Sequence, residues 1–324
     1  MPARKHHYVP QFYQKGFASA DGLLWVYDRK LHIYKRLAPK VICRSENLYT
    51  VKVQPGVNDT TIETEILSPI EGAAAPVIRS LKDGYKPPAL EFASLIVFIS
   101  LQFTRLPSFS RAVSQTLEAL RRERIIYQFG EPGRAAEALQ ELGSQLTPEQ
   151  AIEMVDDLRQ RRITINATEA GFLRMMFHHA QTLGMWLHDT DWTIMVAPTS
   201  TGFIICDHPF TSVPAQGSKL ISSGWGLPGI TVYFPLTRRL CLRAKAGDYG
   251  YRYTQVESRT VRTVNLNIAA NSDRFVMGSN ETQIKAIIER SRSVDVEPGE
   301  RFSITHDQET RILRFVMQPR RYFY

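Results

Sequence analysis

The sequence predicts an α+β fold, because its secondary-structure signals change type twice along the chain. Residues 1–60 carry short β-type runs, residues 61–190 carry helical periodicity, and residues 191–324 return to short β-type runs separated by turn residues. With 324 residues, 43% of them hydrophobic, the chain is long enough to bury a full core. We therefore expect residues 1–324 to form one intimately packed domain with these three sub-regions.

The first sub-region reads as a small β unit. Leu23-Leu24-Trp25-Val26-Tyr27 is rich in β-forming residues, Asp28-Arg29-Lys30 is a turn sequence, and Leu31-His32-Ile33-Tyr34-Lys35 is a partner strand. This order predicts a β-hairpin. A further strand is expected over residues 46–51.

The second sub-region predicts a central helical bundle. Apolar residues recur at helical steps from residue 61, and Gly84 ends this pattern. The next helix begins near Leu90, and its residues 92–101 are apolar on nearly every face, which predicts a helix that is fully buried. This apolar run is too short to cross a bilayer. Further helices are expected to begin at Thr147-Pro148 and at Glu169.

The third sub-region predicts an antiparallel or mixed sheet, with the terminal segment of the chain joined to it. Five short β-rich runs follow one another at a spacing typical of such sheets. They are residues 192–196, 202–206, 230–234, 240–243 and 274–277.

Composition limits the classes of partner and compartment. The net charge of +8 and the isoelectric point near 9.4 favour polyanionic partners, nucleic acid or nucleotides above all. The three cysteines, Cys43, Cys206 and Cys241, are widely separated, which indicates neither a disulfide framework nor a thiolate zinc site. The sequence shows no signal-peptide pattern and no run long enough for a membrane span. We expect a cytoplasmic protein without a membrane partner; its oligomeric state is left open.

The opening stretch organises the rest of the chain. Residues 5–17 hold two histidines and four aromatic residues, an apolar content that would cost several kcal/mol if left in water, at about 25 cal/mol per Å². This stretch is therefore expected to dock. Its expected partners are a second dense motif, Phe203-Ile204-Ile205-Cys206-Asp207-His208-Pro209-Phe210, and the buried helix around Gln102.

These motifs together resemble a widespread, mainly bacterial family known as domain of unknown function 4238. The resemblance rests on the His-His-Tyr-Val-Pro-Gln-Phe-Tyr run from His6, on a Gln-x-x-Arg-x-Pro element from Gln102 to Pro107, and on Asp207-x-Pro209. It extends to about Asn267. Cys206 and His208 stand where the family often has Ser and Asn. The resemblance implies no established activity, so functional expectations must come from the residues.

His6 and His7 are candidate catalytic residues. Adjacent side chains on an extended chain point to opposite faces, so one histidine can reach a site while the other packs or bonds to backbone. The pair is also similar to the opening of His-Asn-His nucleases. That similarity is weak, because no Asn occurs between His7 and His32 and because His32 falls in a strand pattern.

Gln102 and Arg105 stand three residues apart, so their polar ends lie on one face of the helix. Arg105 could form a fork that holds phosphate or carboxylate. Alternatively, it forms a salt bridge at the edge of the core, to Glu65, Glu71 or Asp207.

Asp207 and His208 directly follow an apolar strand, a common place for reactive side chains. Asp207 could bind a divalent metal, orient an imidazole or act as a general base. The alternative is an Asx-type turn in which Asp207 bonds its own backbone before Pro209.

Two functions of different classes follow. The first is a hydrolase, nuclease-like or directed at a nucleotide, that acts on a phosphate-bearing substrate, with a divalent metal as a candidate cofactor. The second is a non-catalytic module that binds nucleic acid or a nucleotide through its basic surface. The catalytic candidates are His6, His7, Asp207 and His208. The substrate-binding candidates are Gln11, Gln102 and Arg105.

Overall fold

The computed structural model confirms the α+β class. It describes residues 5–46, 48–49, 51–54, 57–59, 61–163, 169–216, 229–247, 250–291, 302–306, 313–317 and 323. The chain divides into two compact units, of which the first comprises Met1–Phe109 with Leu173–Tyr324 and the second comprises Ser110–Phe172. The expectation of one packed domain stays a prediction.

The larger sheet of the first unit has five strands and is mixed. Its strands are β7 (Asp191–Val196), β9 (Thr211–Pro214), β10 (Ile230–Pro235), β11 (Leu240–Lys245) and β12 (Gly250–Gln255). They lie in the order β12-β7-β11-β10-β9, and all neighbours are antiparallel except β12 and β7, which are parallel. Buried and half-buried residues alternate along most of β10, as expected where one sheet face packs on the core.

The N-terminal hairpin joins a second sheet. Its strands, β2 (Leu24–Asp28) and β3 (Ile33–Leu37), pair antiparallel as expected, and β2 also pairs with β13 (Phe275–Gly278). On its other side β13 pairs with β8 (Ile205–Cys206), so the order is β3-β2-β13-β8. The start of the chain is thus built into a sheet with strands that lie late in the sequence.

The first of these late strands, β8, is shorter than the sequence predicts. A strand was expected from residue 202, but only Ile205 and Cys206 form one. Asn265 of α8 (Ser258–Asn271) explains the difference, because its amide donates to Gly202 O at 2.9 Å and accepts from Ile204 N at 3.1 Å. A side chain therefore takes the hydrogen bonds that a neighbouring strand would supply.

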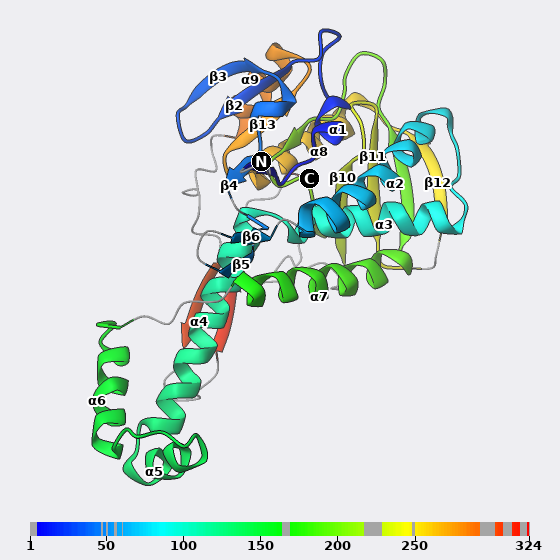
Figure 1. Ribbon diagram of the computed structural model, residues 1–324. Coiled ribbons are helices and arrows are strands. Elements are labelled where there is room, and N and C mark those ends of the chain that lie inside the picture. The colour runs from blue at the N-terminus through cyan, green and yellow to red at the C-terminus, as the bar shows by residue number, and fades with distance from the viewer. Residues whose placement is uncertain are drawn as a thin grey trace. The chain divides into compact units, whose positions relative to one another are not determined.

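Helices cover the larger sheet in Figure 1, where α2 (Ser68–Ser80) and α3 (Ala89–Thr104) lie across its strands. On α3, Phe92 packs on Trp192 of β7 with ring centroids 4.6 Å apart, and Phe98 packs on Phe234 of β10. Most of α3 is buried, as expected. The exception to this burial is a narrow exposed stripe of the helix that includes Val97, which is 43% exposed.

The opening of the chain forms two short elements. They are β1 (Lys5–His7), which pairs antiparallel with β4 (Arg44–Glu46), and α1 (Gln11–Lys15). The strand expected over residues 46–51 is not continuous in the described residues, since β4 ends at Glu46 and Leu48 and Tyr49 lie in a turn. Tyr49 turns inward there and is fully buried.

Several further elements complete the first unit. They are η1 (Pro39–Val41), β5 (Val51–Gln54), β6 (Val57–Asp59), the π-helix η2 (Ile62–Leu67), η3 (Leu81–Asp83), most of α7 (Glu169–His188), α9 (Glu281–Ser291), β14 (Phe302–His306) and β15 (Leu313–Met317). The predicted end at Gly84 is confirmed, because Gly84 adopts a left-handed φ of 77° after η3.

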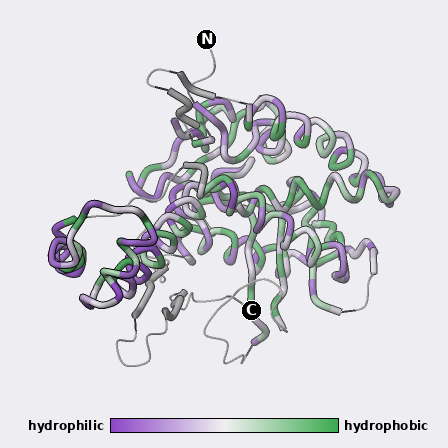
Figure 2. The backbone as a smooth tube through the Cα atoms, turned by 60° about the horizontal axis from the view of Figure 1, so that its bottom comes forward, coloured by the Kyte–Doolittle hydropathy of each residue, from purple (hydrophilic) through white to green (hydrophobic). Residues whose placement is uncertain are grey.

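In its described residues, the second unit has three helices around a small core of its own. They are most of α4 (Pro107–Phe129), α5 (Pro132–Glu141) and α6 (Pro148–Arg159). The predicted start of α6 is confirmed, with Thr147 and Gln150 forming a reciprocal capping box. Hydrophilic and hydrophobic residues alternate along these helices (Figure 2), as expected for amphipathic helices packed on one side.

Among the described residues, no single helix has both the length and the apolar character to cross a membrane. Only α3 and α4, considered together as a bent pair, would reach that length and composition.

Candidate functional site

The opening segment docks on α3 through aromatic side chains. Phe12 and Tyr13 both pack on Phe98, with ring centroids 5.3 and 5.9 Å apart, and Tyr13 also stacks on Phe234. The Tyr13 hydroxyl donates to Pro235 O at the end of β10. Burial raises the pKa of the Tyr8 phenol, and the charges of Cys43 and next Asp207 raise it further. The opening segment thus lies against α3, one of its two expected partners, and its docking on the Asp207 turn stays a prediction.

His6 lies on the inner face of β1. Its ring is buried and stacks on Tyr49, with centroids 5.6 Å apart and planes 6° apart, and its Nδ1 accepts from the backbone N–H of Tyr49 at 3.3 Å. This position makes His6 a packing residue that fixes the Tyr49 turn. The sequence did not decide which of the two histidines packs in the interior, and in the structure this residue is His6.

His7 lies on the opposite face and is half-buried. Its Nε2 lies 3.2 Å from Lys40 O. A carbonyl oxygen can only accept, so Nε2 carries the proton of the neutral ring and Nδ1 carries the lone pair. Burial lowers the pKa of His7 below its ordinary value, and the nearby Arg44 lowers it further. Burial therefore favours the neutral form of the ring.

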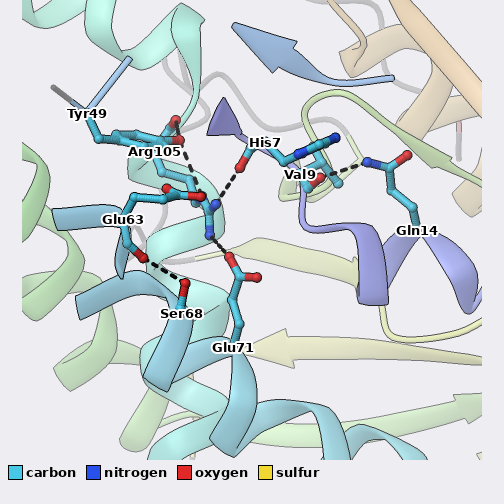
Figure 3. A network of polar contacts seen from close by, with 8 residues as sticks. All are labelled: His7, Val9, Gln14, Tyr49, Glu63, Ser68, Glu71 and Arg105. Carbon is cyan, nitrogen blue, oxygen red and sulfur yellow. Dashed lines mark hydrogen bonds and ion pairs between the residues drawn. The ribbon is translucent and has the colours of Figure 1, made fainter. Parts of the chain in front are cut away.

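Arg105 is the centre of a buried polar network that ties four segments together (Figure 3). It stands at the C-terminal end of α3, and its side chain is 1% exposed. Nη1 donates to Glu71 of α2 at 2.7 Å, Nη2 donates to the backbone oxygen of His7, and Nε donates to the Tyr49 hydroxyl at 3.3 Å. That hydroxyl in turn donates to Arg105 O at 2.6 Å.

These contacts favour the structural interpretation of Arg105. Of the three carboxylates that the sequence offered as partners, Glu71 is the one bound. A buried guanidinium that already donates to a carboxylate, a carbonyl and a hydroxyl has little donor capacity left for a phosphate. A role for Arg105 as phosphate clamp stays a prediction.

Glu63 is a member of this network that the sequence did not single out. Its carboxyl group lies beside the Arg105 guanidinium (Figure 3). Burial raises the pKa of Glu63, and Arg105 partly offsets that rise. Its Oε2 is buried and has no hydrogen-bond partner among the described residues. The residue belongs to a π-helical turn, which hydrophobic periodicity cannot reveal because that signal has the α-helical period.

The three glutamines of this region differ in environment. Gln11 is exposed on the first turn of α1. Gln102 is fully buried on α3, and neither atom of its amide has a hydrogen-bond partner among the described residues. Gln14, which the sequence did not single out, is fully buried, and its Nε2 donates to Val9 O at 2.7 Å, which holds the turn into α1.

Asp207 is buried, and it links the end of β8 to the residues just before β13 through hydrogen bonds. Its carboxylate accepts the backbone N–H groups of Asp273 at 2.9 Å and Arg274 at 2.7 Å, and its own N–H donates to Phe275 O. The carboxylate therefore holds a distant segment, whereas the Asx-type turn, the alternative that the sequence left open, would have closed on its own backbone. Burial, and next the charge of Asp273, raise the pKa of Asp207 to about 7.

His208 lies in a hydrogen-bond cluster with Asn271 of α8. The Asn271 amide nitrogen lies 2.7 Å from His208 Nδ1, and it donates to His208 O at 3.0 Å and Phe210 O at 2.8 Å. The His208 ring also packs edge-on against Phe103, with centroids 6.0 Å apart. These contacts shape the turn that follows β8.

A family model described as "Protein of unknown function (DUF4238)" matches residues 5–282, which is most of the chain. The chain belongs to the DUF4238 family. The resemblance seen in the opening motif, the Gln102 to Pro107 element and the Asp207 turn is thereby confirmed. No curated protein and no solved structure matches the chain.

The DUF4238 motifs meet in the fold, but their polar groups enter different sets of contacts. His6 contacts Tyr49, His7 contacts Lys40, Asp207 contacts Asp273 and Arg274, and His208 contacts Asn271. Within the described part of the chain, no three His, Cys, Asp or Glu side chains are grouped so that they could hold a metal ion. Of the four catalytic candidates, His7 has the ring that is both partly exposed and oriented by a single backbone contact.

Proposed function

We propose that this DUF4238 protein is a non-catalytic module that binds nucleic acid through the basic surface of its N-terminal β unit. The observation that carries this proposal is the distribution of charge. Residues 1–53 contain ten lysines and arginines and only three acidic residues, whereas the whole chain contains 40 and 32. This segment therefore carries a net charge of +7, out of +8 for the chain.

The basic side chains of this segment are accessible to a partner. The exposed ones are Lys5, Lys15, Lys30, Lys35, Arg36, Lys40 and Arg44. Lys5 lies 3.6 Å from Glu46, and Arg36 pairs with Asp21 and lies over the Trp25 ring. Such exposed pairs are weak and are easily exchanged for phosphate contacts.

The hydrolase interpretation has less support. A hydrolytic centre requires an acid or base and its partners around one reacting atom. The four catalytic candidates instead hold four different parts of the backbone or aromatic core, and Arg105 is paired with Glu71. Hydrolysis of a phosphate-bearing substrate stays a prediction that a cleavage assay in the presence of divalent metal would test.

Fluorescence anisotropy with short labelled oligonucleotides, measured over a range of salt concentrations, tests the binding proposal. The double variant Lys40→Gln/Arg44→Gln should bind more weakly, and the slope of log K against log salt should fall by about one for each phosphate that the variant no longer neutralises. The matched control Lys82→Gln/Lys86→Gln removes two exposed lysines outside the segment and should bind like the wild type. Absence of binding at low salt, or equal weakening in both variants, would overturn the proposal.

A further inference from the structure

The two-stranded ribbon formed by β1 and β4 has one buried and one open face. In its register, His7 lies opposite Arg44, His6 opposite Ser45, and Lys5 opposite Glu46. Directly opposed residues share a face, and faces alternate along each strand. His6 occupies the buried face. His7 and Arg44 therefore lie on the open face, together with Lys5 and Glu46.

Around His7, the open face combines positive charge with a hydrogen-bond acceptor on the imidazole ring. Arg44 and Lys40 are exposed beside His7, whereas Lys5, at the far end, is offset by Glu46 at 3.6 Å. Because Nε2 of His7 donates to Lys40 O, the lone pair on Nδ1 is free to accept a hydrogen bond. Nδ1 has no hydrogen-bond partner among the described residues. A phosphate oxygen, itself an acceptor, cannot satisfy Nδ1. The complementary ligand must bring an anionic group and a neutral donor close together.

A ribonucleotide unit has this combination, because its 2′-hydroxyl is a donor near the backbone phosphate. We propose that the face formed by His7, Lys40 and Arg44 binds a ribonucleotide unit of RNA, with the phosphate near the two cationic side chains and the 2′-hydroxyl donating to His7 Nδ1. The proposal rests on the proposed function, since it specifies which nucleic acid that surface prefers. Donors on the bases could also reach Nδ1, but DNA carries them as well as RNA.

The test compares the affinities of single-stranded RNA, DNA and 2′-O-methyl RNA of the same sequence. The wild type should bind RNA about 2- to 10-fold more tightly than the other two, as one hydrogen bond would give. His7→Phe should bind all three equally. His7→Gln, which retains a donor for Lys40 O and an acceptor, should keep part of the preference. His188→Phe, a control at an exposed histidine of α7, should keep all of it.

A pH series on the wild type gives a second measurement that needs no variant. The charged groups that act on the ring are Arg44 of β4, Glu71 of α2 and Arg105 of α3, and burial favours the neutral ring. Below the pKa of His7, Nδ1 becomes protonated and can no longer accept, so the preference for RNA should vanish while affinity for all three ligands rises.

The outcomes separate this inference from the proposed function. Equal binding of RNA and DNA by the wild type, or a preference that survives in His7→Phe or at low pH, overturns the inference and leaves nucleic-acid binding intact. Absence of binding to all three ligands overturns both. If thermal melts show that His7→Phe does not fold, the pH series decides.

Discussion

Arg105 and Glu71 form an ion pair of 2.7 Å between the end of α3 and the first turn of α2. The same guanidinium donates to the backbone oxygen of His7, so the pair also holds the opening segment. A buried cation costs several kcal/mol unless it is paired and hydrogen-bonded. The contact therefore makes the docking of the first residues conditional on the packing of two helices.

Arg105→Lys should lower the stability of the protein without weakening its binding of nucleic acid. Lysine keeps the charge but cannot contact Glu71, His7 O and Tyr49 together, so we expect a loss of about 1 to 3 kcal/mol in the free energy of unfolding. Urea unfolding measures this loss, with Arg79→Lys on the exposed surface of α2 as control. If Arg105→Lys instead weakened oligonucleotide binding and left stability unchanged, the result would support Arg105 as a phosphate clamp.

Phe98→Ala should destabilise the first unit more strongly. The ring is 1% exposed and contacts Phe12, Tyr13 and Phe234, so its removal leaves a cavity where α3, the opening segment and β10 meet. We expect a loss of about 3 to 5 kcal/mol. Val97→Ala, one residue away on the exposed stripe, should change stability by less than about 0.5 kcal/mol. Similar losses in the two variants would mean that the buried face of α3 is misassigned.

The sequence was sufficient to predict the fold class and the main elements, because these depend on periodicity and turn residues. The 23–35 hairpin, the helix around Phe98 and the cap at Thr147 are read from neighbouring residues alone. Pairing of β2 with β13 could not be read in the same way. Strands so far apart in the chain meet through tertiary packing, for which local sequence carries no signal.

The candidate site could be predicted in its residues but not in their contacts. Two adjacent histidines on a strand had to face opposite sides, and the structure shows His6 inside and His7 outside. That Asp207 would hold the N–H groups of Asp273 and Arg274 depends on a strand pairing that the sequence did not reveal. Glu63 was missed because its π-helical turn breaks the α-helical period.

The raised pKa of Asp207 predicts a pH dependence of stability. The pKa of Asp207 is about 7 in the folded chain, and an unfolded aspartate ionises near about 4. Between these values the unfolded chain releases a proton that the folded chain retains, so this group's contribution to stability is full below about pH 4 and declines as pH rises towards 7. The contribution is then constant above about pH 7.

Asp273→Asn tests the cause of this decline. Removing the Asp273 charge should bring the pKa of Asp207 down, although burial still holds it above its ordinary value, so stability should decline less between about pH 4 and pH 7 than in the wild type. Urea unfolding at several pH values measures the difference. Asp83→Asn, at an exposed position of η3, should follow the wild-type curve. Parallel curves for Asp273→Asn and wild type would contradict the coupling of the two carboxyl groups.

Gln102 is the most buried of the three substrate-binding candidates. The variant Gln102→Leu tests whether its amide destabilises the fold or has a partner there. Gln102 is fully buried, and its amide atoms have no hydrogen-bond partner among the described residues. An unsatisfied buried polar group costs about 1 to 3 kcal/mol, and leucine has a similar volume without that cost. If the amide is unsatisfied in solution, Gln102→Leu should raise the free energy of unfolding by an amount in this range.

A decrease in the free energy of unfolding of Gln102→Leu would instead indicate that the amide has a partner. Exposed Gln140→Leu serves as the control for the change of residue type and should shift stability by less than about 0.5 kcal/mol. A loss of stability in Gln102→Leu, measured against that control by urea unfolding, would mean that the amide is satisfied in solution, by a buried water or by another bound molecule. Gln102 would then return as a candidate ligand contact beside α3, in addition to the open face of the β1 and β4 ribbon.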